Sequence, residues 1–255
     1  MQHDRKRSTI TRWSGMAAIG SGLAFGATIA YLFGVLPRAG FTFAMLDDRA
    51  SLLPWLAQHA RLYGGLWLLY FISQALLLPL PGALVAAYAN TNTRGSGVIA
   101  ICAKLGYAAI LLAIVGLVLV YTTSPLVASA YIRTPGDSAA ILLLGDLFAD
   151  TGKEIRLFSE VLLGLWLLGT AATLLQRSRS VLAPWAMLAI GAYTEIVAVI
   201  KISDPLTPLE DTLGLFLALV YGAIGAMLLQ HSRMPEVDDR PVSRSNVNLT
   251  VPEQH

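Results

Sequence analysis

Three charged side chains lie inside long apolar stretches of this 255-residue chain: Lys104, Glu160 and Glu195. An ionisable group inside a membrane-spanning helix must be neutral, paired or in contact with water, and it often belongs to a ligand or proton path. Arg156 comes one helical turn before Glu160, and Lys201 follows Glu195 at the end of the same stretch. These five residues form a candidate intramembrane polar site.

Each of these charges also has a structural interpretation. Glu160 and Arg156 have the i, i+4 spacing of an ion pair on one helix. The long side chain of Lys104 could reach the inner interface or join two helices. Glu195 lies roughly 20 Å from the inner end of its helix, so we predict that it faces the bundle interior. There it would either line a ligand or proton path or form a clamp with Lys104 or Lys201.

Other kinds of site lack the residues that they need. Haem and most membrane copper, zinc and iron sites require imidazole ligands, and no histidine lies in the middle of an apolar stretch; the four are His3, His59, His231 and His255. The sequence contains no Gly-x-Ser-x-Gly, His-Glu-x-x-His or glycine-rich phosphate loop. We therefore assign no catalytic, cofactor-binding or metal-binding residues, and a membrane-embedded enzyme is the least supported function class.

The elements that position these residues are apolar helices. The chain is 55% hydrophobic and 13% charged, against about 25% charged residues in soluble domains. A stretch of about 20 apolar residues crosses the membrane as a helix. Six stretches qualify: 13–36, 62–88, 98–121, 157–179, 181–200 and 209–230. The fold class predicted is all-α, a polytopic membrane helix bundle with six transmembrane helices.

Two further segments are predicted to be short amphipathic helices on the outer surface, at 50–61 and 138–150. Thr151-Gly152 is expected to break the second one before the fourth span. The domain organisation predicted is a basic cytoplasmic N-terminus (1–12), a transmembrane domain (13–231) and a disordered cytoplasmic tail (232–255), which is polar and contains proline.

The distribution of charge predicts the orientation. With both termini in the cytoplasm, the inner segments hold ten Lys and Arg against five acids, including Arg94, Arg177 and Arg179. The outer segments hold seven basic residues and nine acids. Basic residues are enriched in cytoplasmic loops, so we predict that both termini are cytoplasmic. The net charge of +2, without a basic cluster, argues against a nucleic acid partner.

Small residues recur every fourth position in the first and last spans. The two stripes are Ser14, Ala18, Gly22, Gly26, Ala30 and Gly34, and Gly214, Ala218, Gly222 and Ala226. Such stripes allow helices to approach closely in membranes. We predict that both are buried against other helices.

Several segments, taken in order, resemble a known family. They are ASLLPWLAQHARLYGGLWLL, the early Lys104 of the third span, and LLGLWLLGTAATLLQRSRSVLAPWAMLAIGA. The most specific part is the Gly-Leu-Trp-Leu-Leu run that leads to Arg177, Ser178 and Pro184. Residues 50–230 resemble an uncharacterised family of six-helix bacterial integral membrane proteins, a domain of unknown function. The resemblance implies the fold and a location in the bacterial inner (plasma) membrane, and it supplies no catalytic residues.

Two function classes therefore lead. The first is binding or transport of a small molecule, lipid or proton through a pocket around Glu195 in the outer half of the bundle. The second is a structural or accessory subunit, whose partners besides the lipid bilayer would be another membrane protein or a second copy of the chain. A cavity connected to Glu195 would favour the first, and a closed bundle with a flat apolar face would favour the second.

Overall fold

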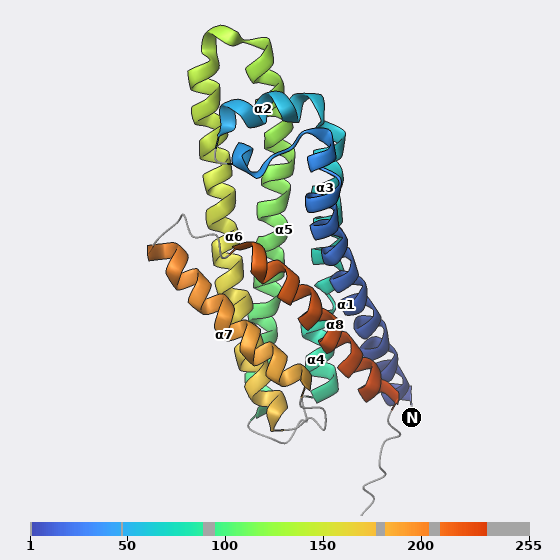
Figure 1. Ribbon diagram of the computed structural model, residues 1–255. Coiled ribbons are helices and arrows are strands. Elements are labelled where there is room, and N and C mark those ends of the chain that lie inside the picture. Colours follow the sequence, from blue (N-terminus) through green and yellow to red (C-terminus); the bar gives the residue numbers. More distant parts are fainter. Residues whose placement is uncertain (1, 47, 89–94, 177–181, 204–209, 234–255) are drawn as a thin grey trace, which may run out of the picture.

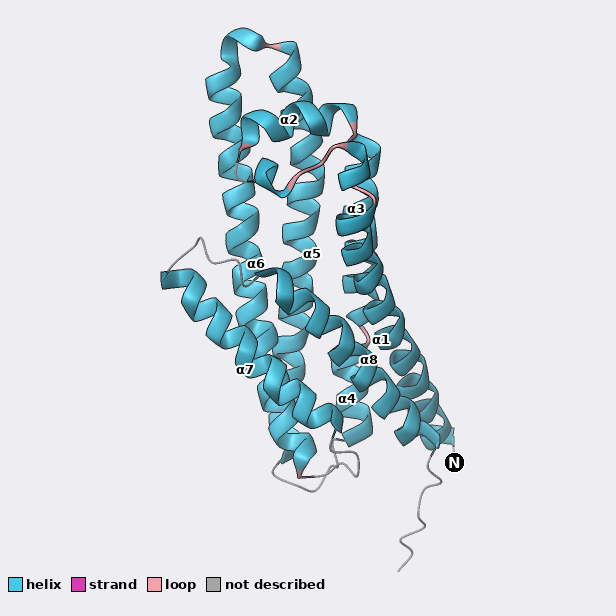
Figure 2. Cartoon of the chain, in the orientation of Figure 1, coloured by secondary structure: helices cyan, strands magenta, loops and turns pink. Residues whose placement is uncertain are grey.

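The computed structural model describes the chain except for residues 1, 47, 89–94, 177–181, 204–209 and 234–255. The described residues form helices joined by short loops, without a strand (Figure 2). The α-helices are α1 (Gln2–Gly34), α2 (Arg49–Gln58), α3 (Ala60–Leu77), α4 (Leu80–Tyr88), α5 (Gly95–Arg133), α6 (Ser138–Leu175), α7 (Leu182–Ser203) and α8 (Glu210–Arg233). Short 3-10 helices lie at Pro37–Ala39, Phe43–Leu46 (η2) and Pro135–Asp137.

The apolar helices match the predicted membrane bundle. Five segments are long and apolar enough to cross a membrane: Thr9–Ala39, Ala60–Tyr88, Gly97–Arg133, Ser138–Leu175 and Leu182–Lys201. A shorter apolar stretch, Phe216–Ser232, lies within α8. The all-α polytopic bundle is therefore confirmed. Arg94, Arg177, Arg179 and nearly all of the predicted tail lie outside the described residues, so the orientation and the tail remain predictions.

Helices α5 and α6 are longer than predicted and form a hairpin that extends beyond the rest of the bundle (Figure 1). With 39 and 38 residues, each is roughly 58 Å long, about twice the hydrocarbon thickness. The third span does not end at Tyr121 but continues to Arg133. Residues 138–150 are the first part of α6 and not a separate surface helix, so α2 is the only one of the two predicted outer helices to stand alone within the described residues.

The expected break at Thr151-Gly152 is absent for a physical reason. A Cβ at Gly152 would lie 2.6 Å from Cγ2 of Val120, so this glycine serves close packing of α6 on α5. The Thr151 hydroxyl donates a hydrogen bond of 2.7 Å to the Leu147 carbonyl within the same helix. Packing thus keeps helical a dipeptide whose local preference is to interrupt a helix.

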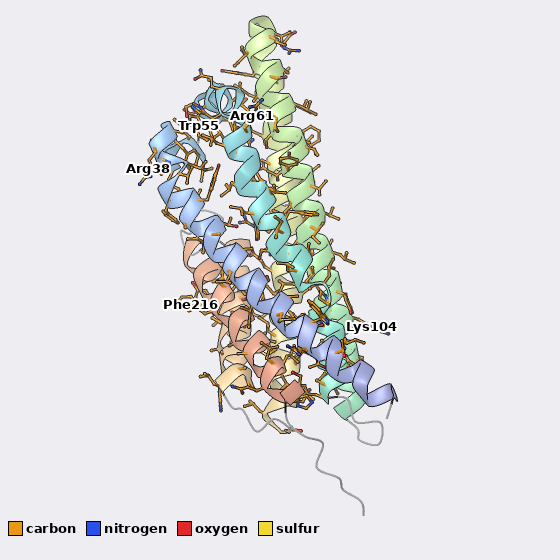
Figure 3. The ribbon with its side chains drawn as sticks, turned by 90° about the vertical axis from the view of Figure 1, so that its right-hand side faces the viewer. Arg38, Trp55, Arg61, Lys104 and Phe216 are labelled. Atoms are coloured by element: carbon orange, nitrogen blue, oxygen red, sulfur yellow. The ribbon has the colours of Figure 1, made fainter. Side chains whose placement is uncertain are left out.

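The two small-residue stripes are buried only where α1 and α8 approach each other. Ser14 and Ala18 are buried, and a Cβ at Gly22 would lie 2.6 Å from the Ala218 carbonyl oxygen. Outside the stripes, Gly225 also approaches α1, since a Cβ there would lie 2.6 Å from the Gly15 carbonyl oxygen. Other stripe positions do not fit the prediction. A Cβ would meet nothing within 4 Å at Gly26, Gly34 or Gly222, and Ala30 and Ala226 are exposed. Figure 3 shows α1 as a long rod that α8 accompanies over only part of its length.

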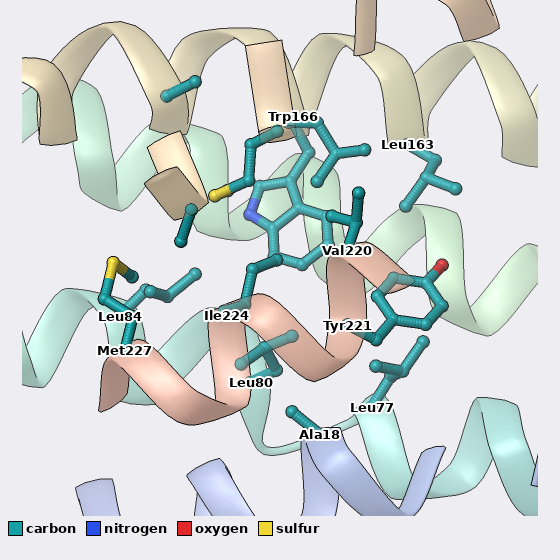
Figure 4. Packing of buried hydrophobic residues seen from close by; sticks show 14 of the residues in the cluster. Ala18, Leu77, Leu80, Leu84, Leu163, Trp166, Val220, Tyr221, Ile224 and Met227 are labelled. Carbon is teal, nitrogen blue, oxygen red and sulfur yellow. The ribbon is translucent and has the colours of Figure 1, made fainter. Parts of the chain in front are cut away.

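The half of the bundle that contains the start of α1, called inner after the predicted orientation, is filled by a hydrophobic core around Trp166 of α6. Figure 4 shows its ring against Val220 and Ile224 of α8, with the α4 residue Leu80 in the same cluster. Trp166 is 1% exposed, and Gly106 of α5 lets the indole lie directly against the α5 backbone. A second core lies at the outer end, where α2 covers α3 and α5.

Candidate functional site

Glu160 lies at the centre of an ion cluster between α6 and α7. Its carboxylate is 2.8 Å from Nζ of Lys201 and 3.4 Å from Nε of Arg156. The side chains of Glu160 and Lys201 are only 15% and 11% exposed. The predicted i, i+4 pair with Arg156 is confirmed, and Lys201, considered from the sequence as a partner for Glu195, binds Glu160.

Glu195 lies on α7 against Gly164 of α6, one helical turn deeper than Glu160. The missing side chain of Gly164 makes room for the carboxylate, because a Cβ there would overlap with it. Its Oε1 atom is buried and accepts no hydrogen bond from a described residue. Glu195 thus contacts α6 at the α6–α7 interface, without a lysine partner in the described part of the chain.

This geometry predicts that Glu195→Gln leaves the free energy of unfolding unchanged within about 0.5 kcal/mol. Lys201 pairs with Glu160, so the amide would leave no lysine unpaired. Unfolding of the purified protein by dodecyl sulfate in mixed micelles measures the change. A loss of stability that Lys201→Met then reverses would show that Glu195 forms a clamp with Lys201 after all.

Lys104 lies apart from both carboxylates. It is exposed on α5 towards the inner half of the bundle (Figure 3), and it forms no ion pair with any residue that the structure describes. Exposure on the lipid-facing surface fits the interpretation that its ammonium group reaches the inner interface. The structure therefore brings together Arg156, Glu160 and Lys201, places Glu195 one turn below them and leaves Lys104 outside.

A cavity of 520 Å³ lies above this cluster, at the outer end of the bundle. Helix α2 and η2 form its roof, and α3, α5 and α6 form its walls. Arg156 lines the cavity, whereas the other four sequence-predicted residues do not. This cavity is therefore not the pocket expected around Glu195, which stays a prediction; it lies nearer the end of the bundle that α2 covers.

The roof of the cavity is fixed by contacts of Trp55 in α2. Its indole N–H donates a hydrogen bond of 2.8 Å to the Ala39 carbonyl, and its ring packs on Phe41 and stacks on His59. Asp48 caps the helix by accepting a hydrogen bond of 3.1 Å from the backbone N–H of Ala50. These contacts hold α2 across the ends of the long helices, so the cavity has a built cover.

The α3 wall is aromatic. Tyr63, Trp67 and Tyr70 recur at i, i+4 and i+7 and therefore share one face of the helix. The Tyr63 and Trp67 rings lie edge to face, with centroids 5.7 Å apart. The buried indole N–H of Trp67 donates no hydrogen bond to a described residue. This N–H is thus a polar group in the wall in addition to the two tyrosine hydroxyls.

The α6 wall and the roof carry positive charge. Arg49, Lys153 and Arg156 line the cavity, and no Asp or Glu among the described residues does so. Each cation has an acid outside the cavity: Asp146 pairs with Arg49, Asp150 lies 3.9 Å from Lys153, and Glu160 lies beside Arg156. The lining of the cavity therefore contains basic residues, and their acid partners lie outside it.

Sequence reasoning missed this cavity although two of its signals are visible. The aromatic spacing at 63, 67 and 70 could have been identified as one helix face, and the basic residues of the outer segments were counted only for orientation. The sequence did not predict the wall of basic residues, because residues 138–150 were expected to form a separate helix on the membrane surface. Only the continuous α6 places Lys153 and Arg156 opposite α3.

Comparisons with known proteins give no relative. No family, no curated protein and no solved structure matches this chain.

Proposed function

We propose that this protein binds an amphipathic small molecule or lipid in the cavity at the outer end of its bundle, as a binding or transport protein. The cavity carries the proposal. Its volume of 520 Å³ falls within the range of about 300–1,000 Å³ that is typical of ligand sites. Its aromatic and aliphatic walls would receive an acyl or ring system, and its basic and hydroxyl side chains would fix a polar group.

The surroundings of the cavity support uptake from the membrane. Helices α7 and α8 end partway along α5 and α6, so they do not cover the outer part of the bundle (Figure 1). On the predicted topology, with both termini cytoplasmic in a bacterial inner membrane, the cavity would lie at the level of the outer leaflet. A ligand could then enter from lipid or from the outer aqueous phase.

Filling the cavity is expected to abolish binding. Ala149 lines the cavity on α6, so Ala149→Phe should reduce occupancy at least tenfold without unfolding the protein. Binding can be followed as quenching of Trp67 by lipids with brominated acyl chains in nanodiscs, obtained as the difference between the wild type and Trp67→Phe.

Ala140→Phe is the matched control, because Ala140 is exposed on the same helix and does not line the cavity. It should leave the quenching of Trp67 unchanged. Equal quenching in Ala149→Phe and Ala140→Phe would contradict a ligand in the cavity.

The exposed leucines of the α5–α6 hairpin favour a second function, that of an accessory subunit. Leu126, Leu143 and Leu147 are 69%, 72% and 61% exposed on the part of the hairpin near the level of α2 (Figure 1). Exposed apolar patches of this kind are typical of protein interfaces. Cross-linking from position 143 in intact membranes tests this function, and a product containing only this chain would indicate a homo-oligomer.

A further inference from the structure

We infer that the ligand of the outer cavity is an anionic amphiphile, an acyl chain with a phosphate or carboxylate head group. The head group would lie against Arg49, Lys153 and Arg156, and the chain would lie against the aromatic wall of α3. This inference rests on the proposed function and specifies the chemistry of its ligand.

The first argument is the separation of charge. Three cations and no acid line the cavity within the described residues. A neutral or cationic ligand would make no use of these cations. An anionic head group can bind them beside the acids that pair with them outside the cavity, and arginine offers paired donors that suit phosphate and carboxylate oxygens.

The second argument concerns the height of the cations along α6. Arg49 pairs with Asp146, and Lys153 and Arg156 follow along the same helix. From 146 to 156 the helix rises roughly 15 Å, so the cations line one side of the cavity from the roof to its base. The base lies directly above the Glu160–Lys201 pair, where the polar wall ends and the core around Trp166 begins.

The third argument is that Glu160 has a second cationic partner besides Arg156. Lys201 already holds this carboxylate at 2.8 Å, a shorter contact than the 3.4 Å to Arg156. Glu160 therefore keeps a counter-ion when Arg156 turns to a ligand. The unpaired N–H of Trp67 supplies a further donor on the opposite wall, suited to an ester or acid oxygen next to the head group.

Native mass spectrometry of the full-length protein, released from a neutral detergent, tests the inference. The probes are phosphatidylglycerol and phosphatidylcholine with identical acyl chains, and oleate as a free acid. A bound probe molecule is counted as a cavity ligand only if it is present on the wild-type protein and absent from the Ala149→Phe variant. We expect at least a tenfold preference for phosphatidylglycerol or oleate over phosphatidylcholine. Binding of phosphatidylglycerol would assign the ligand to the membrane lipids, and binding of oleate alone would assign it to free acids.

Charge variants give the sharper comparison. Lys153→Gln and Arg156→Gln should each weaken binding of the anionic probe about fivefold and leave phosphatidylcholine unaffected. Lys153 is 73% exposed, so its replacement does not threaten the fold. Lys104→Gln is the matched control, because this exposed cation does not line the cavity. It should leave the binding of every probe unchanged.

Two outcomes would overturn the inference. Equal binding of phosphatidylglycerol, phosphatidylcholine and oleate, sensitive to Ala149→Phe but not to Lys153→Gln, would retain the proposed function and reject the anionic ligand. The absence of any bound molecule that Ala149→Phe removes would reject both.

Discussion

Glu160→Gln is expected to lower the free energy of unfolding by about 3 kcal/mol, because it removes a carboxylate that neutralises a buried ammonium group. Lys201 is 11% exposed and lies 2.8 Å from the carboxylate. The amide fills the same volume but cannot neutralise the lysine. Unfolding in mixed micelles of dodecyl sulfate and a neutral detergent measures the difference.

The double variant Glu160→Gln with Lys201→Met should recover much of this loss, since it removes both charges and keeps an apolar side chain in place. Asp150→Asn is the control, because Asp150 and Lys153 form an exposed pair, 69% and 73% exposed, and such pairs contribute little. Equal effects of Glu160→Gln and Asp150→Asn would mean that the α6–α7 pair is open to solvent.

Gly22→Leu is expected to cost about 3 kcal/mol, at the upper end of the range for overpacking. A Cβ at Gly22 would lie 2.6 Å from the Ala218 carbonyl oxygen. Because this oxygen belongs to the α8 backbone, it cannot move aside as a side chain would. The added leucine must therefore push α1 and α8 apart. The same micelle titration, or the midpoint of thermal unfolding in detergent, measures the effect.

Two matched substitutions on α1 isolate the cause. Gly26→Leu adds the same side chain one turn later, where a Cβ would meet nothing within 4 Å, and it should cost well under 1 kcal/mol. Leu23→Ala removes a lipid-facing side chain that is 71% exposed and should be tolerated. Similar losses for Gly22→Leu and Gly26→Leu would show that the effect comes from helix propensity and not from the contact with α8.

The sequence predicts the bundle well because hydrophobic length directly constrains a membrane helix. It predicts the ends of α5 and α6 poorly because these depend on contacts between the two helices. Gly152 illustrates the difference: its local preference suggests a break, and its role as a packing residue against Val120 becomes visible only when α5 lies beside it.

The candidate site was predicted in part for a similar reason. The pair of Arg156 and Glu160 follows from spacing along one helix. The partner of Lys201 depends on the offset between α6 and α7, which spacing along either helix does not specify. The cavity depends on how α2, α3, α5 and α6 come together, and no single stretch of sequence contains that information.

The limited reach of α7 has a consequence for the surrounding bilayer. Lys201, two residues before the end of α7, meets Glu160, which lies fifteen residues before the end of α6, a rise of roughly 22 Å. Helix α7 is long enough to cross a membrane, but it is tilted against α6 (Figure 1), so the contact with Glu160 lies less than the hydrocarbon thickness of about 30 Å from the end of α6. A bilayer adapts to such hydrophobic mismatch by thinning locally. We expect the outer-leaflet head groups on this side to sink towards the level of Arg156, so that a deformation of the membrane, without movement of the protein, delivers lipid head groups to the base of the cavity.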